Sequence, residues 1–255
     1  MDKNNKLKKI KINWIEIILF LFAIVTSSYF IFANIDTNNW DTYLIYVDIF
    51  IGIIAAIALS KRYRYAWILL IIDAVFYGSV MFATGSYALA TVNVIFLPII
   101  LIFAGINWKK EGFTEQNLIK TRKLNFWQGI FIVTLITILT VGFAAFSAYV
   151  VIDLIGEDEV PTYQIALDAF SASISLVAFI FSMLRYRETF FLYTLLNIVK
   201  IIMFSLILFA FDKQEGSDKT TLIISLILAI SYFFNALYGL FMWNKGSKEI
   251  ISTDI

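Results

Sequence analysis

Seven polar side chains lie within the long apolar stretches of this sequence, and their types suit the binding of a small polar molecule. They are three carboxylates, three amides and one amine: Asp48, Asp73, Asp168, Asn93, Asn197, Asn235 and Lys200. Moving a charged group to the centre of a membrane helix costs about 2.5–3.5 kcal/mol on insertion scales. We therefore expect these groups to face the interior of a helix bundle or a wet cavity.

One helix face carries most of this chemistry. Phe190, Tyr193, Asn197 and Lys200 recur at spacings of three and four residues, which places them on one side of a helix. They would form an aromatic wall with an amide and an amine beside it, which suits stacking and hydrogen bonding. We predict that this face and its neighbours bind the substrate through seven residues: Phe190, Tyr193, Asn197, Lys200, Asn93, Asp73 and Asn235.

Structural roles compete with ligand binding at several of these positions. Asp48 and Asp168 lie within about two turns of the predicted span ends, where a solvated end or helix capping is favoured over ligand contact. Lys200 can form an ion pair with Asp73 or Asp168 instead of contacting substrate, and both alternatives stay open. The three asparagines can also form hydrogen bonds between helices.

The composition excludes several kinds of chemistry. The chain has no Cys and no His, so disulfides, thiol catalysis, Cys/His metal sites and an imidazole base are excluded. Neither a dinucleotide-binding glycine motif nor a P-loop occurs. The aspartates form no catalytic spacing, which disfavours an intramembrane enzyme. We predict no catalytic residue, metal or cofactor, and a net charge of +1 gives no reason to expect nucleic acid.

The elements that hold these residues must be membrane helices. The chain is 60% hydrophobic and 15% charged, with a mean hydropathy of +0.83, far more apolar than a soluble domain. A helix needs roughly 20 apolar residues to cross a bilayer. Eight stretches qualify, at about Trp14–Ala33, Asp41–Ser60, Tyr65–Phe82, Tyr87–Ile106, Trp127–Leu154, Ala166–Leu184, Thr189–Phe211 and Thr220–Trp243. The first is too long for a signal peptide and lacks a cleavage site, so we expect an anchor.

Charge segregation predicts the orientation of these spans. Of the 20 Lys and Arg residues, 17 fall in the N-terminal tail, in alternate loops and in the C-terminal tail. The positive-inside rule then places both termini in the cytoplasm, in a multi-pass protein of the cell membrane. Tryptophans near span ends are expected to anchor the helices at the interface: Trp14, Trp40, Trp108, Trp127 and Trp243.

Spans two to four and six to eight look like two copies of one triplet. Each triplet has a short basic first loop, Arg62–Arg64 or Arg185–Arg187, and each ends at a tryptophan, Trp108 or Trp243. A linker span between them gives the two triplets one orientation, as parallel repeats. Chance similarity of two hydropathy patterns is the alternative. Pro98 removes one backbone bond from its span, which makes it a possible point of flexing. The predicted divisions are residues 1–39, 40–108, 109–160, 161–243 and 244–255.

These residues resemble the PnuC family of vitamin B3 transporters over roughly residues 40–245. In the first triplet the similarity covers Lys61 to Trp67, then Phe76-Tyr77, and an asparagine five residues before a proline, Asn93 and Pro98. In the second triplet, an arginine and a glutamate precede an aromatic pair and an asparagine. The residues in that order are Arg187, Glu188, Phe190, Tyr193 and Asn197.

The resemblance implies a SWEET-like, all-α membrane fold with two three-helix repeats, a linker helix and an extra N-terminal helix. It also implies facilitated diffusion of nicotinamide riboside, retained inside the cell by a separate kinase, and a homotrimeric assembly. Relatives that carry thiamine or deoxynucleosides provide alternative substrates, and a non-transporting membrane protein is a third alternative.

Three departures from the family pattern bear on the substrate. Phe190 and Tyr193 stand where the family has two tryptophans, Lys200 where it has a small or neutral residue, and Ile100 where it has a glutamine. A lysine ammonium repels a cationic nicotinamide or thiazolium ring unless a carboxylate such as Asp73 neutralises it.

Overall fold

The regular structure of the protein is helical throughout the part that can be described. The computed structural model describes residues 40–83, 85–113, 118–150, 161–210 and 219–251, with a few isolated positions between 14 and 28. Within these ranges it contains helices and isolated bridges but no strand, which confirms the all-α prediction. The predicted first span, Trp14–Ala33, lies largely outside the described residues, so the count of eight spans stays a prediction.

The helices follow the predicted spans closely. They are α2 (Trp40–Ser60), α3 (Ala66–Ala83), α4 (Tyr87–Thr91), the π-helical segment η1 (Val92–Phe96), α5 (Leu97–Lys110), α6 (Phe126–Tyr149), α7 (Thr162–Met183), α8 (Thr189–Ala210) and α9 (Lys219–Ile251). Among the described residues, 5 helices are long and apolar enough to cross a membrane, counting α4, η1 and α5 as one. Hydropathy located the helix centres well, whereas α9 continues beyond its predicted end at Trp243.

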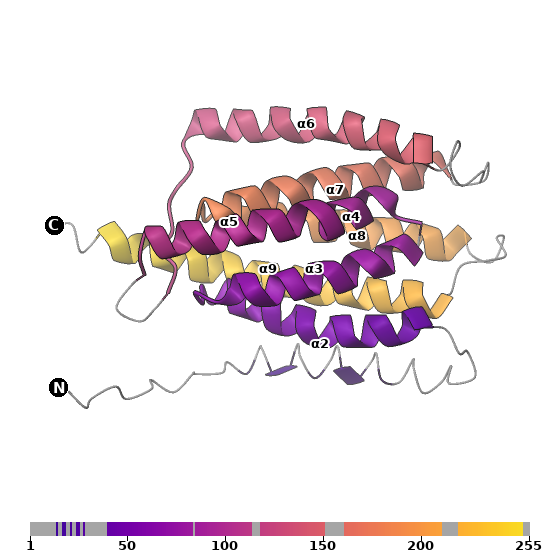
Figure 1. Cartoon of the computed structure of the whole chain (residues 1–255), viewed down its shortest axis with the longest axis horizontal. Helices are drawn as coiled ribbons and strands as arrows, with labels where there is room; N and C mark the ends of the chain where they lie inside the picture. Colours follow the sequence, from indigo (N-terminus) through magenta and orange to yellow (C-terminus); the bar gives the residue numbers. More distant parts are fainter. Residues whose placement is uncertain are drawn as a thin grey trace.

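The helices run side by side along the long axis of the molecule (Figure 1). α2 packs against α3 and α9, α5 against α3 and α7, and α8 against α7 and α9. α6, the predicted linker, lies along the outside of this bundle and packs mainly on α7 (Figure 1). Its Val133, Ile138 and Val141 side chains are exposed, as expected of side chains that face lipid.

The helix that carries Asn93 changes its winding one turn before Pro98. Pro98 has no backbone N–H and cannot donate to the carbonyl four residues earlier. The chain responds with a π-helical turn over Val92–Phe96, in which the Leu97 N–H bonds the Val92 oxygen. Single π-turns inside α-helices frequently accompany functional sites. The predicted interruption is therefore real, whereas flexing at this point stays a prediction.

The two basic loops that the sequence pairs have the same backbone geometry. Arg62 has φ 63° and Arg185 has φ 67°, both in the left-handed region. The residue after each donates its N–H back to the helix, Tyr63 to Ala58 at 2.9 Å and Tyr186 to Phe181 at 2.9 Å. This is the Schellman arrangement, which satisfies the carbonyls at the C-terminal ends of α2 and α7.

Two tryptophans predicted as interfacial anchors are instead buried. Trp108 is 1% exposed and Trp243 is 0% exposed. The Trp108 Nε1 donates to the Met183 carbonyl at 3.1 Å, and the Trp243 Nε1 donates to the Leu59 carbonyl at 3.0 Å. The prediction was wrong because a helix C-terminus exposes carbonyls that need donors, and an indole N–H supplies one. These bonds tie α5 to α7 and α9 to α2 in an equivalent way.

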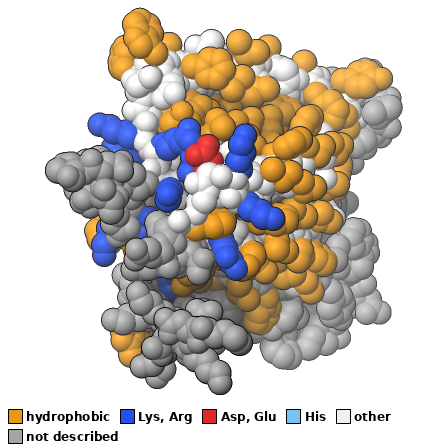
Figure 2. Space-filling model, turned by 60° about the vertical axis from the view of Figure 1, so that its left-hand side comes forward, with side chains coloured by type: hydrophobic (Ala, Val, Ile, Leu, Met, Phe, Trp, Pro, Cys, Tyr) orange, Lys and Arg blue, Asp and Glu red, His pale blue; other side chains and the backbone are white. Residues whose placement is uncertain are grey.

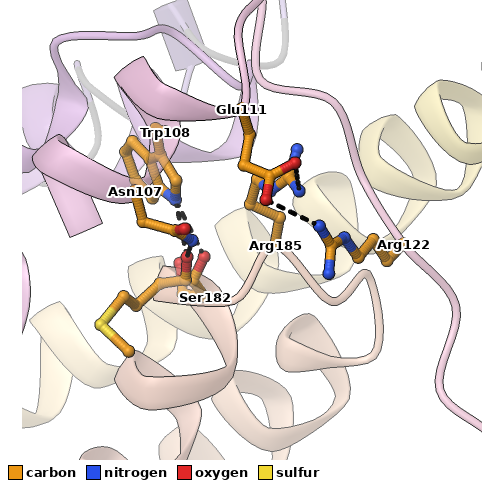
Figure 3. Close-up of polar contacts among 7 residues, drawn as sticks. Asn107, Trp108, Glu111, Arg122, Ser182 and Arg185 are labelled. Atoms are coloured by element: carbon orange, nitrogen blue, oxygen red, sulfur yellow. Dashed lines mark hydrogen bonds and ion pairs between the residues drawn. The ribbon is translucent and has the colours of Figure 1, made fainter. Parts of the chain in front are cut away.

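An ion-pair network joins the same end of the bundle. Glu111, which follows α5, contacts Arg185 of the α7–α8 loop at 3.0 Å and Arg122 of the segment before α6 at 3.2 Å (Figure 3). The two guanidinium groups, Arg185 first, lower the pKa of the Glu111 carboxyl below its ordinary value of 4.5. Burial lowers the pKa of Arg185, which the Glu111 carboxylate offsets in part. Figure 2 shows Lys and Arg gathered at this end, flanked by apolar side chains.

Candidate functional site

The candidate site is a cavity of about 100 Å³ within the bundle, with room for several water molecules. Side chains from α2, α3, η1, α7, α8 and α9 line it. The structure brings all the predicted site residues together on its wall: Asp73, Asn93, Phe190, Tyr193, Asn197, Lys200 and Asn235. Asp73 and Asn235, the most distant of these residues, are 162 positions apart along the chain and line the same cavity. The role of the seven residues in binding substrate stays a prediction.

The aromatic wall is a set of perpendicular rings rather than a flat surface. The ring centroids of Phe190 and Tyr193 lie 5.4 Å apart with an interplanar angle of 73°. Phe179 of α7 meets Tyr193 in the same way, at 5.3 Å and 72°. Phe190 fits closely against α9 because Gly239 has no side chain, and a Cβ there would overlap the phenyl ring. A planar ligand can stack on one of these rings and meet the edge of another.

Two asparagines present their amides in the same way. The Asn93 Nδ2 donates to the Leu89 carbonyl at 2.7 Å, and the Asn197 Nδ2 donates to the Tyr193 carbonyl at 2.8 Å. Each bond stays within its own helix, so hydrogen bonding between helices is not the role of these two amides. The bond fixes each side chain and leaves its Oδ1 and second N–H for a ligand in the cavity.

Lys200 faces the cavity without forming either of the predicted ion pairs. Its Nζ lies 4.4 Å from the centroid of the Tyr77 ring, which is cation–π geometry. Among the described residues, no carboxylate oxygen lies within 4.0 Å of this amine. The Tyr77 ring therefore stabilises the ammonium at this position. The ion-pair alternative was therefore wrong for this conformation.

Asp48 is buried, and its predicted solvated position is wrong. Its side chain is 1% exposed and meets the side chain of Asp73 on the next helix. Asp73 lines the cavity, whereas Asp48 lies behind it.

Asp168 caps a helix, as predicted, but it caps a helix other than its own. Its Oδ2 accepts the Ala88 N–H at 2.8 Å and its Oδ1 accepts the Leu89 N–H at 3.1 Å. These amides begin α4 and have no partner within their own helix. Ser147 of α6 approaches the same carboxylate at 3.5 Å. Asp168 thus positions the helix that carries Asn93 and does not line the cavity.

Some residues of the cavity wall escaped the sequence prediction. Tyr77 lies four residues after Asp73, and Tyr232 lies three residues before Asn235, so each shares a helix face with a predicted site residue. Both could have been predicted from spacings of three and four residues on one helix face, the pattern that identified the α8 residues. Ser175 of α7 also lines the cavity. No cluster of three or more potential metal ligands occurs in the part of the chain that the structure describes.

Comparison with known proteins agrees with this architecture. Residues 42–245 match the family model described as "Nicotinamide mononucleotide transporter". The fold is similar to a solved structure described as "Crystal structure of the Vitamin B3 transporter PnuC", with 21% sequence identity and a TM-score of 0.69. The similarity covers 93% of this chain and 94% of that chain. No curated protein sequence matches the chain. The family consists of membrane transporters rather than enzymes, and this chain belongs to the nicotinamide mononucleotide transporter (PnuC) family.

Proposed function

We propose that this protein carries nicotinamide riboside, or a closely related vitamin or nucleoside, across the cell membrane. One observation supports the proposal above all: the aromatic and amide residues chosen from the sequence line a single cavity inside the bundle. A nucleoside-like molecule offers a planar ring for stacking and hydroxyl or amide groups for hydrogen bonding. The cavity provides perpendicular aromatic rings for the first and asparagine amides for the second.

Each wall of the cavity has a part in this mechanism. Phe190 and Tyr193 stack against the ring of the substrate, and Asn197 beside them binds a polar group on it. Asn93 and Asn235 provide amides from the opposite helices. Asp73 and Lys200 place a carboxyl group and an amine on the same cavity wall without contacting each other.

Transport proceeds by alternating access, with the two triplets moving against each other around the site. The basic end is held by contacts that join α5 to α7 and α9 to α2 through Trp108 and Trp243, reinforced by the Glu111–Arg185 ion pair. Opening this end requires these contacts to separate, so they form a gate. By the positive-inside rule this gate is cytoplasmic.

Substrate moves down its gradient, and a separate kinase retains it inside the cell by phosphorylation. Lys200 favours a second candidate substrate class, because an ammonium that no carboxylate contacts repels a cationic ring. A neutral (deoxy)nucleoside avoids that repulsion. Thiamine, which carries a thiazolium ring, encounters it as nicotinamide riboside does.

A thermal-shift screen separates these substrates. Purified protein is heated with nicotinamide riboside, thiamine, uridine or deoxyadenosine, and a ligand at 100 times its Kd stabilises the native state by about 2.7 kcal/mol. We expect one of these compounds to raise the melting temperature, and replacing Asn197 by Ala to reduce the shift. If Lys200→Ser strengthens binding of the cationic ligands, the lysine opposes cations. If none of the compounds shifts the melting temperature, the proposed function is wrong.

A further inference from the structure

A short segment crosses the basic end of the bundle and bonds to both of the equivalent loops. We call residues 118–124, which lie between α5 and α6, the strap. The Ile119 N–H donates to the Arg62 carbonyl at 2.8 Å. The Arg122 N–H donates to the Arg185 carbonyl, also at 2.8 Å. Arg62 and Arg185 are the left-handed residues of their loops, so the strap binds the same point of each loop.

The spacing of these two bonds limits the distance between the loops. Ile119 and Arg122 are three residues apart, and three extended residues span at most about 11 Å. The loop after α2 belongs to the first predicted triplet, and the loop after α7 belongs to the second. The two triplets therefore cannot move apart at this end while both bonds are intact. Opening this end requires the strap to leave one of the loops.

The second triplet holds the strap by several contacts. The Arg187 N–H donates to the Arg122 carbonyl at 3.0 Å, so Arg122 bonds to the loop after α7 through both its N–H and its carbonyl. The Thr121 hydroxyl donates to the Trp243 carbonyl of α9 at 3.2 Å. The Thr121 side chain is buried, which protects this bond from water.

The far end of the strap is also fixed to the second triplet. The Leu124 N–H donates to the Glu188 carboxylate at 3.0 Å. The strap then leads into α6, where the Gln128 amide donates to the Tyr186 hydroxyl at 2.9 Å. Because α6 packs mainly on α7, the strap and α6 are expected to move with the second triplet.

Contacts with the first triplet gather at the other end of the strap. Leu118 forms an isolated bridge with Tyr63, and Ile119 forms one with Phe113, which follows α5. The Ile119 side chain is fully buried and belongs to the hydrophobic core. Separation of Leu118 and Ile119 from these partners frees the first triplet and leaves the contacts with the second intact.

One ion pair also joins the strap to the end of α5. Glu111 contacts Arg122 at 3.2 Å, beside its contact with Arg185 (Figure 3). The Arg122 and Glu111 side chains are exposed, and an exposed ion pair contributes little to stability. The backbone bond and the buried side chain of Ile119 are therefore the main contacts that opening must break.

We propose that the strap controls the opening of the cytoplasmic end. It stays on the second triplet, and Ile119 must leave the Arg62 loop before substrate can pass between the cavity and the cell interior. The inference rests on the proposed transport function and adds no driving force to it. By holding the closed form, the strap slows entry and exit by the same factor, so substrate still equilibrates down its gradient.

The absence of cysteine from the sequence permits a cross-linking test. Tyr63→Cys/Leu118→Cys joins the strap to the first triplet. Arg122→Cys/Tyr186→Cys joins it to the second and is the matched control. Both pairs are bridge partners, whose Cα separation of about 4.5–5.5 Å suits a disulfide. Oxidation forms each cross-link, and dithiothreitol breaks it, so each protein is compared with its own reduced form.

Proteoliposomes containing each pair exchange radiolabelled nicotinamide riboside or uridine, present at equal concentrations inside and outside. We expect oxidation of the first pair to stop exchange and dithiothreitol to restore it, because the first triplet can no longer leave the strap. Oxidation of the control pair should leave the exchange rate of its reduced form, because that contact stays intact during opening. Unchanged exchange by the oxidised first pair, or equal loss in both pairs, overturns the proposal.

A second measurement needs no substrate. Ser175 lines the cavity, so a Ser175→Cys reporter in inside-out vesicles reacts with a charged methanethiosulfonate reagent when the cytoplasmic end opens. Adding Ile119→Val removes one buried methyl group from the strap and should raise the labelling rate about fivefold. Ile132→Val, a buried position on α6, is the matched control and should keep the original rate. Equal labelling with and without Ile119→Val overturns the proposal. The expected labelling with no exchange of either probe by the reduced proteins supports the strap and contradicts the proposed substrates instead.

Discussion

Replacing Asp168 by Asn is expected to destabilise the protein through a helix that does not contain the substitution. The carboxylate accepts the N–H groups of Ala88 and Leu89, one on each oxygen, at 2.8 and 3.1 Å. A hydrogen bond to a charged group contributes about 1.5–3 kcal/mol. Asparagine keeps one acceptor and turns an NH₂ group toward the other N–H. Asp168 is 1% exposed, so no water can replace the lost hydrogen bond. We therefore expect the free energy of unfolding to fall by about 2–3 kcal/mol.

Thermal unfolding of purified protein in detergent measures this loss. For a chain of this size, about 2–4 °C is expected per kcal/mol, so the melting temperature should fall by about 4–12 °C. Ser147→Ala is the matched control, because its hydroxyl approaches the same carboxylate only at 3.5 Å and should change the melting temperature little. Asp168→Ala removes both acceptors and should cost more than Asp168→Asn. If Asp168→Asn melts within about 1 °C of the wild type, the carboxylate is not the cap of α4.

Two further changes follow from the packing and the charges. Gly239→Ala places a methyl group into the Phe190 ring and should lower the melting temperature, because overpacking costs about 1–3 kcal/mol. Gly142→Ala on α6 meets nothing within 4 Å and should be neutral or stabilising, so equal loss in both variants would contradict the packing described. The pKa of Glu111 is lowered in the folded protein by Arg185, so its stabilisation is complete above the ordinary value of 4.5 and is lost as pH falls below it. Glu111→Gln should therefore melt below the wild type at pH 7, and the difference should shrink as the pH falls below 4.5 and through the lowered pKa of Glu111. A difference that does not shrink in acid would refute the ion pair.

Hydropathy predicted most of the fold because a membrane helix must satisfy its own backbone and present apolar side chains to lipid. The helix-face argument also placed Phe190, Tyr193, Asn197 and Lys200 on one wall, because residues three and four apart lie on the same side of a helix. Both patterns lie within single helices and are independent of which helices are neighbours.

The errors concern contacts between helices distant in sequence. Trp108 and Trp243 have the position of interfacial anchors, but only the packing of α5 on α7 and α9 on α2 shows that each indole meets a helix C-terminus. In the same way, the burial of Asp48 beside Asp73 and the position of Lys200 over the Tyr77 ring follow from contacts between different helices. Such pairings are set by tertiary structure and leave no spacing signal in the sequence.

The central claim is that the cavity lined by Asn197 binds a molecule that the protein carries across the membrane. The most direct test is the uptake of radiolabelled nicotinamide riboside, thiamine, uridine and deoxyadenosine into proteoliposomes at equal pH. We predict saturable uptake of at least one compound by the wild type and by Ser147→Ala. In Asn197→Ala the apparent affinity should be about tenfold weaker, because the loss of a hydrogen bond of about 1.4 kcal/mol changes the affinity by that factor. Non-saturable uptake of all four compounds, or unchanged affinity in Asn197→Ala, would contradict the account.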